Sequence, residues 1–180
     1  MIGRFIAVVG PSGVGKDSVM QALAAQDARF VLARRVITRP SDAGGEAFEG
    51  VSEATFKAQE AAGEFALSWS AHGLFYAIPG AVSDDLQQGR DVLANLSRAV
   101  LLQALAQFAR FEVINLTAER AILAQRLTAR GRETADQIAS RLDRATAPLP
   151  DEIKRHDIDN SAGLSATVQA ILARLYPVRV

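Results

Sequence analysis

FIAVVGPSGVGKDSV, residues 5–19, decides the fold of this 180-residue chain. Its first five residues form a continuous apolar run, as expected for a central parallel strand that is buried on both faces. Residues 10–16 then have the G-x-x-x-x-G-K spacing of a P-loop, and a helical pattern follows over 17–26. Glycines let backbone N–H groups point inward around a phosphate, and the helix N-terminus adds partial positive charge. The stretch therefore predicts a strand, a phosphate-binding loop and a helix, with Lys16 reaching the β- and γ-phosphates of a nucleotide.

Strand and helix patterns alternate along the rest of the chain, which is typical of an open parallel sheet with right-handed crossovers. Strands are expected over 30–37, 91–96, 111–116 and 153–158, and helices over 52–62, 82–88, 98–109, 118–129, 134–147 and 164–175. Segment 41–79, with short strands between 66 and 78, interrupts the alternation. We expect one α/β domain over 1–180, a P-loop NTPase fold with an open parallel five-stranded sheet flanked by helices. Its expected parts are a core (1–40 and 80–180), an inserted acceptor-binding lobe (about 41–79) and an arginine-rich lid (about 130–137).

The composition excludes several classes of protein. Lys plus Arg and Asp plus Glu each number 20, whereas proteins that bind nucleic acid through bulk electrostatics usually have a basic excess. The absence of cysteine excludes disulfides and thiolate sites, and the two histidines, His72 and His156, are too far apart to suggest a zinc site. No apolar stretch approaches the ~20 residues of a membrane span, and the short N-terminal run is typical of a strand and not of a secretion signal. We expect a cytoplasmic protein that binds anions through individually placed groups.

The residue after the loop lysine departs from the usual pattern. Most P-loops have Ser or Thr there to ligate Mg²⁺, whereas this chain has Asp17 followed by Ser18. A carboxylate is a hard oxygen ligand and could hold the metal directly or through water. It could equally cap the helix, because a negative charge in the first turn interacts favourably with the helix dipole. Both interpretations of Asp17 stay open.

Arginines gather in the second half of the chain. Arg126 and Arg130 are four residues apart, so they share one helix face. Phosphoryl transfer needs cations on the migrating group, and a closing lid also keeps water away from ATP. Arg120 and Arg144 are expected on a solvated surface instead, with nearby carboxylates as partners. The residues predicted to act on the phosphates are Lys16, Arg126, Arg130, Arg132 and Arg141.

Polar and aromatic side chains mark the expected acceptor site. The carboxyl ends of parallel strands face the substrate crevice, and hydroxyl, amide and guanidinium groups follow the second and third main strands. His72 and Tyr76 carry polar tips and are site candidates, with core packing of the lobe as the alternative. Trp69 and Phe75 are expected in the core of the lobe. The residues predicted to line the acceptor site are Thr38, Arg39, Ser68, His72, Tyr76, Asn95 and Arg98.

The loop GPSGVGK (10–16) is similar to that of the guanylate kinase family. The similarity covers nearly the whole chain, with TR (38–39), GLFY (73–76), RLTARGR (126–132) and IASRL (138–142). It implies a kinase that uses ATP and Mg²⁺, with adenine between the lid and segment 159–161. Asn160 offers adenine both a donor and an acceptor, and a helix cap is the alternative. The predicted ATP-binding residues are Gly10, Pro11, Ser12, Gly13, Val14, Gly15, Lys16, Asp17, Ser18 and Asn160.

The acceptor pocket departs from the guanylate kinase pattern. SDA (41–43) stands where that family carries a second arginine. That family also carries a tyrosine after its Gly-Glu element, whereas Phe48 and Val51 flank EG (49–50) here. LSW (67–69) replaces its base-reading glutamate, and ANL (94–96) replaces an aspartate pair. A guanine site cannot lose the carboxylate that pairs with the N–H edge of the base.

With these departures the chain resembles the ribose 1,5-bisphosphate phosphokinase branch, which acts in phosphonate breakdown. That resemblance implies transfer of a phosphoryl group from ATP to ribose 1,5-bisphosphate, giving ADP and 5-phospho-α-D-ribose 1-diphosphate. The implied partner is a small sugar phosphate, with no nucleic acid and no membrane. A nucleoside monophosphate kinase with a rebuilt pocket is the first alternative. A non-catalytic guanylate-kinase-like binding module is the second, although such modules characteristically lose the loop lysine that Lys16 provides here.

Overall fold

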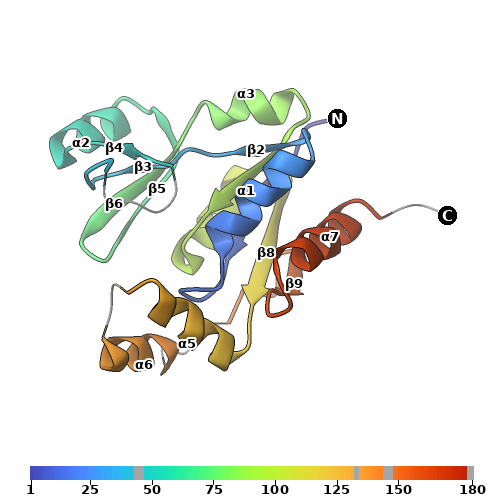
Figure 1. Cartoon of the computed structure of the whole chain (residues 1–180). Coiled ribbons are helices and arrows are strands. Elements are labelled where there is room, and N and C mark those ends of the chain that lie inside the picture. The colour runs from blue at the N-terminus through green and yellow to red at the C-terminus, as the bar shows by residue number, and fades with distance from the viewer. Residues whose placement is uncertain (43–46, 132–133, 144–147, 178–180) are drawn as a thin grey trace.

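The computed structural model describes residues 1–42, 47–131, 134–143 and 148–177. At its centre is a five-stranded parallel sheet in the order β2-β7-β1-β8-β9 (Figure 1). The strands are β1 (Phe5–Val9), β2 (Phe30–Leu32), β7 (Asp91–Asn95), β8 (Phe111–Thr117) and β9 (Arg155–Asp159). The predicted open parallel sheet is confirmed, with β1 in the central position that its uniformly apolar sequence requires.

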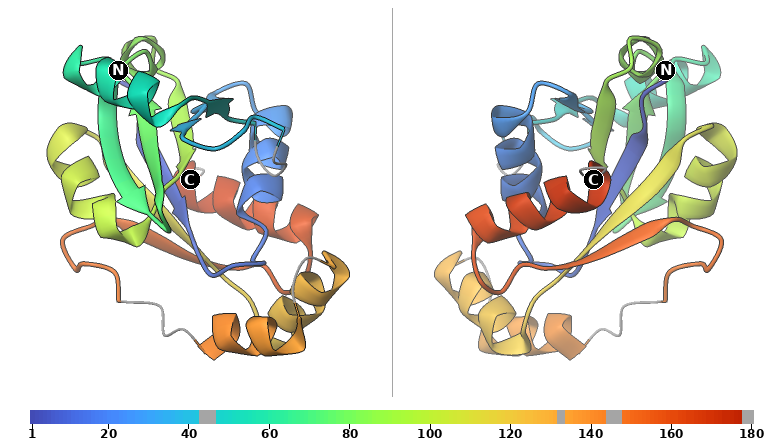
Figure 2. Two further views of the ribbon diagram at one scale, coloured as in Figure 1. Left: turned by 90° about the vertical axis from the view of Figure 1, so that its left-hand side faces the viewer. Right: turned by 90° about the vertical axis from the view of Figure 1, so that its right-hand side faces the viewer.

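Helices cover both faces of this sheet (Figure 2). Alternate residues of β1 point to opposite sides, so Phe5, Ala7 and Val9 contribute to one buried cluster while Ile6 and Val8 contribute to the other. The first cluster is completed by α3 (Val82–Gln87), the 3₁₀ turn η1 (Arg98–Val100) and α4 (Leu101–Gln107). The second is completed by α1 (Lys16–Gln26) and α7 (Leu164–Leu175). The two layers fix the position of the loop between β1 and α1.

A smaller sheet forms a lobe beside the core, at the upper left of Figure 1. Its strands, in the order β4-β3-β6-β5, are β4 (Glu49–Gly50), β3 (Val36–Ile37), β6 (Leu74–Pro79) and β5 (Phe65–Ala71). Helix α2 (Glu53–Ala61) packs on this sheet through Phe56. The centre of the Phe56 ring lies 4.9 Å from the ring centre of Phe65 and 5.5 Å from that of Phe75. The Ser52 hydroxyl accepts the Thr55 N–H at 3.1 Å and so caps the start of α2.

The single strand expected over 30–37 is wrong. The structure divides this segment between two sheets: β2 pairs parallel with β7 in the core, and β3 pairs antiparallel with β6 in the lobe. The polar pair Arg34–Arg35 lies between the two short strands, where the chain leaves the core. The lobe sheet therefore begins at Val36, ahead of residue 41. Thr38 and Arg39 consequently follow a lobe strand and not a core strand.

Two helices lie below the core (Figure 1), around the segment predicted to be a lid (about 130–137), and we call them the lid helices or, together, the lid. They are α5 (Arg120–Ala129) and α6 (Ala135–Asp143), within the stretches expected to be helical, although residues 144–147 lie outside the described residues. The lobe borders the carboxyl ends of β1 and β7, because residues at those ends and residues of the lobe line one cavity. Among the described residues, no helix is long and apolar enough to cross a membrane.

The opposite end of the sheet is held by a buried ionic network. The Arg4 guanidinium donates to Asp91 at 3.0 Å through Nε and to the Leu175 carbonyl at 3.1 Å through Nη1. Burial opposes ionisation of Asp91, but hydrogen bonds from Arg4 and Tyr176 outweigh it and hold the pKa of Asp91 below its ordinary value. Glu112 accepts from His156 at 2.7 Å. These groups join the amino ends of the strands and lie far from the P-loop.

Candidate active site

The loop between β1 and α1 has the geometry of a phosphate cradle. Gly13 and Gly15 have positive φ values of 84° and 95°, which favour glycine. A Cβ at Gly13 would lie 3.1 Å from Leu127, and one at Gly15 would lie 2.9 Å from the Asn160 amide nitrogen. The first N–H groups of α1 have no partners within the helix and can bind phosphate oxygens. The loop therefore fits the phosphates of a nucleotide.

Lys16 folds back over this loop. Its Nζ donates to the Gly10 carbonyl at 3.0 Å and contacts the Pro11 carbonyl at 3.4 Å. Burial lowers the pKa of Lys16, Asp17 partly offsets this, and the like charges of Arg35, Arg130 and Arg98 lower the pKa further. So much positive charge around one lysine favours a polyanion at this point.

Asp17 lies between the loop and the end of β7. The Asn95 amide donates to its Oδ1 at 3.3 Å. Among the described residues, no group of three or more His, Cys, Asp or Glu side chains could hold a metal ion. A Mg²⁺ ion here would take most of its ligands from phosphates and water, as Mg²⁺ usually does, and Asp17 would be the protein carboxylate that the loop offers it.

The lid arginines reach the loop from below. Arg126 donates to the Val14 carbonyl at 3.2 Å and to the Asn160 carbonyl at 2.8 Å, so it braces the loop from outside. Arg141 donates to the Ser12 hydroxyl at 2.9 Å, which joins α6 to the tip of the loop. These contacts place two of the predicted phosphate-binding arginines around the P-loop.

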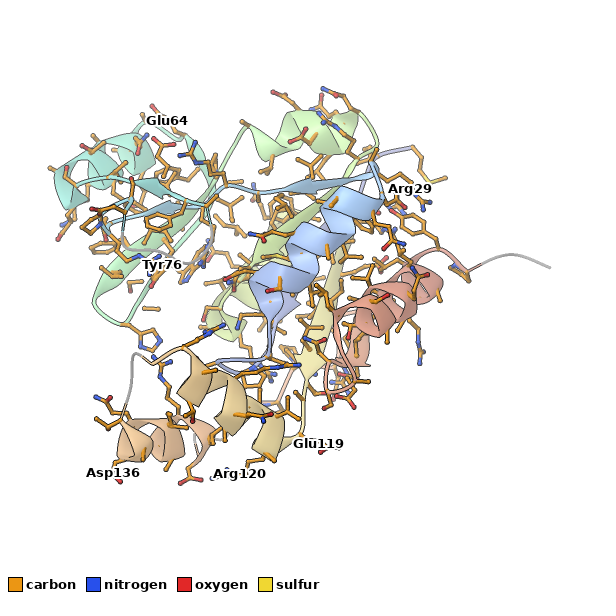
Figure 3. All side chains as sticks on the ribbon, viewed as in Figure 1. Arg29, Glu64, Tyr76, Glu119, Arg120 and Asp136 are labelled. Atoms are coloured by element: carbon orange, nitrogen blue, oxygen red, sulfur yellow. The ribbon has the colours of Figure 1, made fainter. Side chains whose placement is uncertain are left out.

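The remaining arginines divide between the site, the surface and the undescribed residues. Arg130 directly follows α5 and is exposed beside the loop. Arg132 and Arg144 lie outside the described residues. Arg120 donates to the Leu142 carbonyl at 3.1 Å and pairs with Asp143, on the outer edge of the lid (Figure 3). Arg120 therefore has the solvated surface position expected for it.

A cavity of about 390 Å³ opens between the loop, the lid and the start of α7. Asn160 is only 4% exposed there: its amide donates to the Val14 carbonyl at 2.7 Å and accepts from the Thr167 hydroxyl at 2.6 Å. Gly163, not Asn160, precedes the first turn of α7. The alternative of a helix cap is therefore wrong, and the side chain ties the loop to α7; its contact with adenine stays a prediction. The cavity is lined by Gly13, Gly15, Ser18, Arg126, Ala129, Arg130, Asn160 and Leu164.

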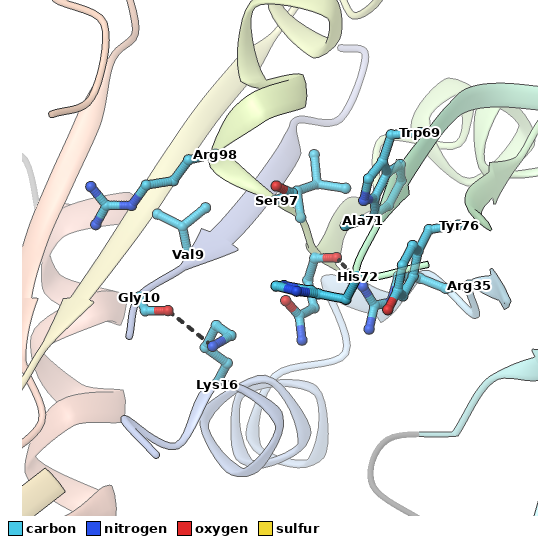
Figure 4. A pocket seen from close by; sticks show the side chains of 12 residues that line it. Val9, Gly10, Lys16, Arg35, Trp69, Ala71, His72, Tyr76, Ser97 and Arg98 are labelled. Carbon is cyan, nitrogen blue, oxygen red and sulfur yellow. Dashed lines mark hydrogen bonds between the residues drawn. The ribbon is translucent and has the colours of Figure 1, made fainter. Parts of the chain in front are cut away.

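A second cavity, of about 380 Å³, lies on the lobe side of Lys16 (Figure 4). It brings together residues from the P-loop, the start of β3, the β5–β6 hairpin and the end of β7. Six of the predicted residues line it, namely Gly10, Lys16, His72, Tyr76, Asn95 and Arg98. The other lining residues are Val9, Arg35, Trp69, Ala71, Leu96 and Ser97. We call this cavity the acceptor cleft.

Arg35 and Trp69 were not predicted as site residues. Arg35 donates to the Asn95 carbonyl at 3.1 Å and lies 5.3 Å from the centre of the Tyr76 ring. Burial lowers the pKa of Arg35 to about 10. Trp69 was expected in the core of the lobe, which is wrong: its ring stacks on Tyr76 at 5.4 Å and forms a wall of the cleft. Strand alternation is the signal that could have identified Trp69, since it shares a face of β5 with Ala71.

Three predicted acceptor residues lie outside the cleft. The Thr38 hydroxyl accepts the Phe75 N–H at 2.9 Å, and the Arg39 guanidinium lies 4.4 Å from the centre of the Phe48 ring. The Ser68 hydroxyl donates to Glu60 on α2, on the side of β5 away from the cleft. In this arrangement the three residues support the lobe.

His72 occupies the tip of the hairpin that borders the cleft. It has a φ of 53°, in the left-handed region, and Gly73 follows with a φ of 75°. A two-residue turn with both φ values positive matches the twist of a hairpin, and His, like Asn and Asp, adopts such a φ more often than other non-glycine residues. Figure 4 shows His72 pointing into the space between Lys16 and Tyr76.

Known proteins are similar to this chain in sequence and in fold. No protein-family model matches the chain. A ribose 1,5-bisphosphate phosphokinase PhnN from Ruegeria sp. (strain TM1040) is 52% identical over 174 residues, which cover 94% of this chain and 92% of the relative. The PhnN of Pseudomonas fluorescens (strain SBW25) is 46% identical, over 97% of this chain and 96% of that one. Guanylate kinase from Anaplasma phagocytophilum shares the fold, with a TM-score of 0.67 over 99% of this chain and 88% of that structure at 15% identity. Identity of this extent, on a site with an intact phosphate loop and a cationic cleft, shows that the chain belongs to the ribose 1,5-bisphosphate phosphokinase family.

Proposed function

We propose that this chain transfers the γ-phosphoryl group of ATP to the 1-phosphate of ribose 1,5-bisphosphate, giving ADP and 5-phospho-α-D-ribose 1-diphosphate. One observation carries the proposal: Lys16, Arg35 and Arg98 all line the acceptor cleft, and no carboxylate is among its described lining residues. Such a cleft suits a small, doubly phosphorylated acceptor. A site that reads guanine would need a carboxylate for the N–H edge of the base. The names of the curated relatives agree with this acceptor.

The residues of the chain contribute mainly position and charge to this reaction. An oxygen of the 1-phosphate attacks the γ-phosphorus, and the bond from that phosphorus to the oxygen bridging the β- and γ-phosphates breaks, so that ADP leaves. The acceptor is already an oxyanion, so the reaction needs no base to remove a proton. Lys16 and the lid arginines Arg130 and Arg141 would neutralise the charge on the phosphoryl group as it moves. Arg98, held by Asn115 at 3.0 Å, would orient the accepting phosphate.

We further propose that Mg²⁺ accompanies ATP and that the protein works in the cytoplasm, where ATP is available. The P-loop N–H groups would hold the phosphates, and Asp17 would contact the ion directly or through water. When bound, the ion would neutralise charge between the β- and γ-phosphates. The cavity beside Arg130 and Leu164 would take the adenosine.

An acceptor panel tests the proposal. Purified protein with ATP and Mg²⁺ is offered ribose 1,5-bisphosphate, GMP, AMP and CMP at equal concentrations, and ADP release is measured. We expect ribose 1,5-bisphosphate to exceed every nucleotide by a factor of ~10⁴ in kcat/KM, the scale on which a site rejects a ligand whose polar groups it cannot pair. Efficient turnover of a nucleotide and none of the sugar bisphosphate would establish a nucleoside monophosphate kinase instead.

A further inference from the structure

The acceptor cleft has two cationic ends. At the P-loop end, Arg98 lies near Gly10, with Lys16 beneath them (Figure 4). At the lobe end, Arg35 lies beside Tyr76. Figure 4 draws Lys16 between Arg98 and Arg35, so an acceptor with a phosphate at each end of a pentose would meet an arginine at each end of the cleft.

The two ends differ in what they can do to a phosphate. The reacting phosphate must meet the γ-phosphate, which the loop and Lys16 place at the P-loop end. A second phosphate on the same acceptor therefore lies toward the lobe. Resting on the function proposed above, we propose that Arg35 binds the 5-phosphate of the acceptor, the phosphate that does not react, and so makes the enzyme select a bisphosphorylated pentose.

The setting of Arg35 suits this role. Its hydrogen bond to the Asn95 carbonyl and its contact with the Tyr76 ring fix the guanidinium in place before an acceptor arrives. A preorganised planar fork loses little entropy when it binds a phosphate through two N–H groups. Burial disfavours its charge, as the lowered pKa of about 10 shows, and a dianion bound beside it would reverse that effect. The stacked pair Trp69 and Tyr76 supplies an apolar wall for the sugar between the two phosphates.

The chain offers a matched control in the preceding residue. Arg34 is exposed, lines no part of the cleft, and contacts the Phe48 carbonyl at 3.4 Å. Arg34→Gln and Arg35→Gln remove the same charge from adjacent positions, so a general loss of positive field would affect both. Only Arg35→Gln would weaken the binding of a phosphate inside the cleft.

Two sugar monophosphates separate the two ends in a binding measurement. Isothermal titration of wild type, Arg35→Gln and Arg34→Gln with ribose 5-phosphate and with ribose 1-phosphate reports each phosphate on its own. We expect Arg35→Gln to weaken the binding of ribose 5-phosphate by about 10- to 100-fold, the scale of lost charge-assisted hydrogen bonds, and to leave the affinity for ribose 1-phosphate nearly unchanged. Arg34→Gln should change neither. Equal weakening of both sugars, or stronger weakening of ribose 1-phosphate, would overturn the assignment of Arg35.

Turnover keeps this inference separate from the proposed function. With ribose 1,5-bisphosphate, Arg35→Gln should raise KM and change kcat little, whereas a residue that merely supports the fold would lower the melting temperature and affect both sugars. Arg35→Lys keeps the charge without the fork and should fall between wild type and Arg35→Gln in ribose 5-phosphate affinity. If Arg35→Lys has a native melting curve but binds ribose 5-phosphate as weakly as Arg35→Gln does, a charge-based role is contradicted. If wild type fails to phosphorylate ribose 1,5-bisphosphate, the proposed function fails, and the binding titrations still decide whether Arg35 holds a sugar phosphate.

Discussion

Replacing Asn160 with alanine distinguishes a residue that braces the loop from one that reads adenine. The structure gives this amide two buried hydrogen bonds, to the Val14 carbonyl at 2.7 Å and from the Thr167 hydroxyl at 2.6 Å. Two such bonds at about 1 kcal/mol each give a loss of about 2 kcal/mol, because Val14 keeps Arg126 and Thr167 keeps the Gly163 carbonyl as partners. For a chain of this size, that loss corresponds to a fall in melting temperature of about 4–8 °C.

The assay combines thermal unfolding without ligand with the Michaelis constants for ATP and GTP. A brace should lower the melting temperature and raise both constants by a similar factor, since the displaced loop holds phosphates and not the base. Thr167→Val is the matched variant: it removes one of the two bonds and should give part of the stability loss with a smaller effect on ATP. An Asn160→Ala variant that melts like wild type but has a raised Michaelis constant for ATP and not for GTP would refute the bracing role and support contact with adenine.

Three further changes follow from the same structure. Lys16→Ala should lower kcat by at least ~100-fold with a native melting curve, because the residue places charge on the transferring phosphate; near-normal turnover would mean that the P-loop assignment is wrong. Asp17→Ser should shift the Mg²⁺ concentration that gives half-maximal activity if Asp17 contacts the ion, and an unchanged titration would leave it only the favourable dipole interaction at the start of α1. Asp91→Asn should lower the free energy of unfolding by about 3 kcal/mol at pH 7, measured by urea denaturation, because the buried Arg4 then keeps only Glu112, at 3.7 Å, as an ionic partner. Since the pKa of Asp91 is lowered in the folded state, the stability that its charge contributes is present above its ordinary pKa of 3.8 and is lost as the pH falls through the folded-state pKa. The difference in unfolding free energy between variant and wild type should therefore shrink in acid, and a difference that grows in acid would contradict this.

The parts of the molecule that follow local rules could be predicted from the sequence. The apolar run Phe5–Val9, the glycine spacing and the helix after Lys16 are short-range patterns, and the structure has each of them. Residues of the acceptor cleft depend on where the chain passes from one sheet to another, which no local pattern marks. The apolar residues on both sides of Arg34 and Arg35 read as one strand, so Arg35 was placed inside it and Thr38 and Arg39 at its end. The structure breaks that strand, and Arg35 is the residue that reaches the cleft.

Asn160 and Trp69 show a second limit. The types of both residues were consistent with several roles, and only tertiary contacts decide among them. The Val14 carbonyl and the Thr167 hydroxyl, far apart in sequence, meet at the Asn160 amide. Trp69 faces the cleft because β5 pairs with β6 in a register that sets it opposite Tyr76. The Asn160 contacts have no signature within a short window of sequence, and strand alternation places Trp69 on one face of β5 without showing what that face meets.

The central claim is that the acceptor is a phosphate on C1 of a ribose that also carries a 5-phosphate. The most direct test is ³¹P NMR of a reaction that contains the protein, ATP, Mg²⁺ and ribose 1,5-bisphosphate. The account predicts that the signal of the 1-phosphate disappears and is replaced by two coupled diphosphate signals, while the 5-phosphate signal persists and ADP accumulates in equal amount. ADP and inorganic phosphate forming together, with both sugar phosphate signals unchanged, would contradict it.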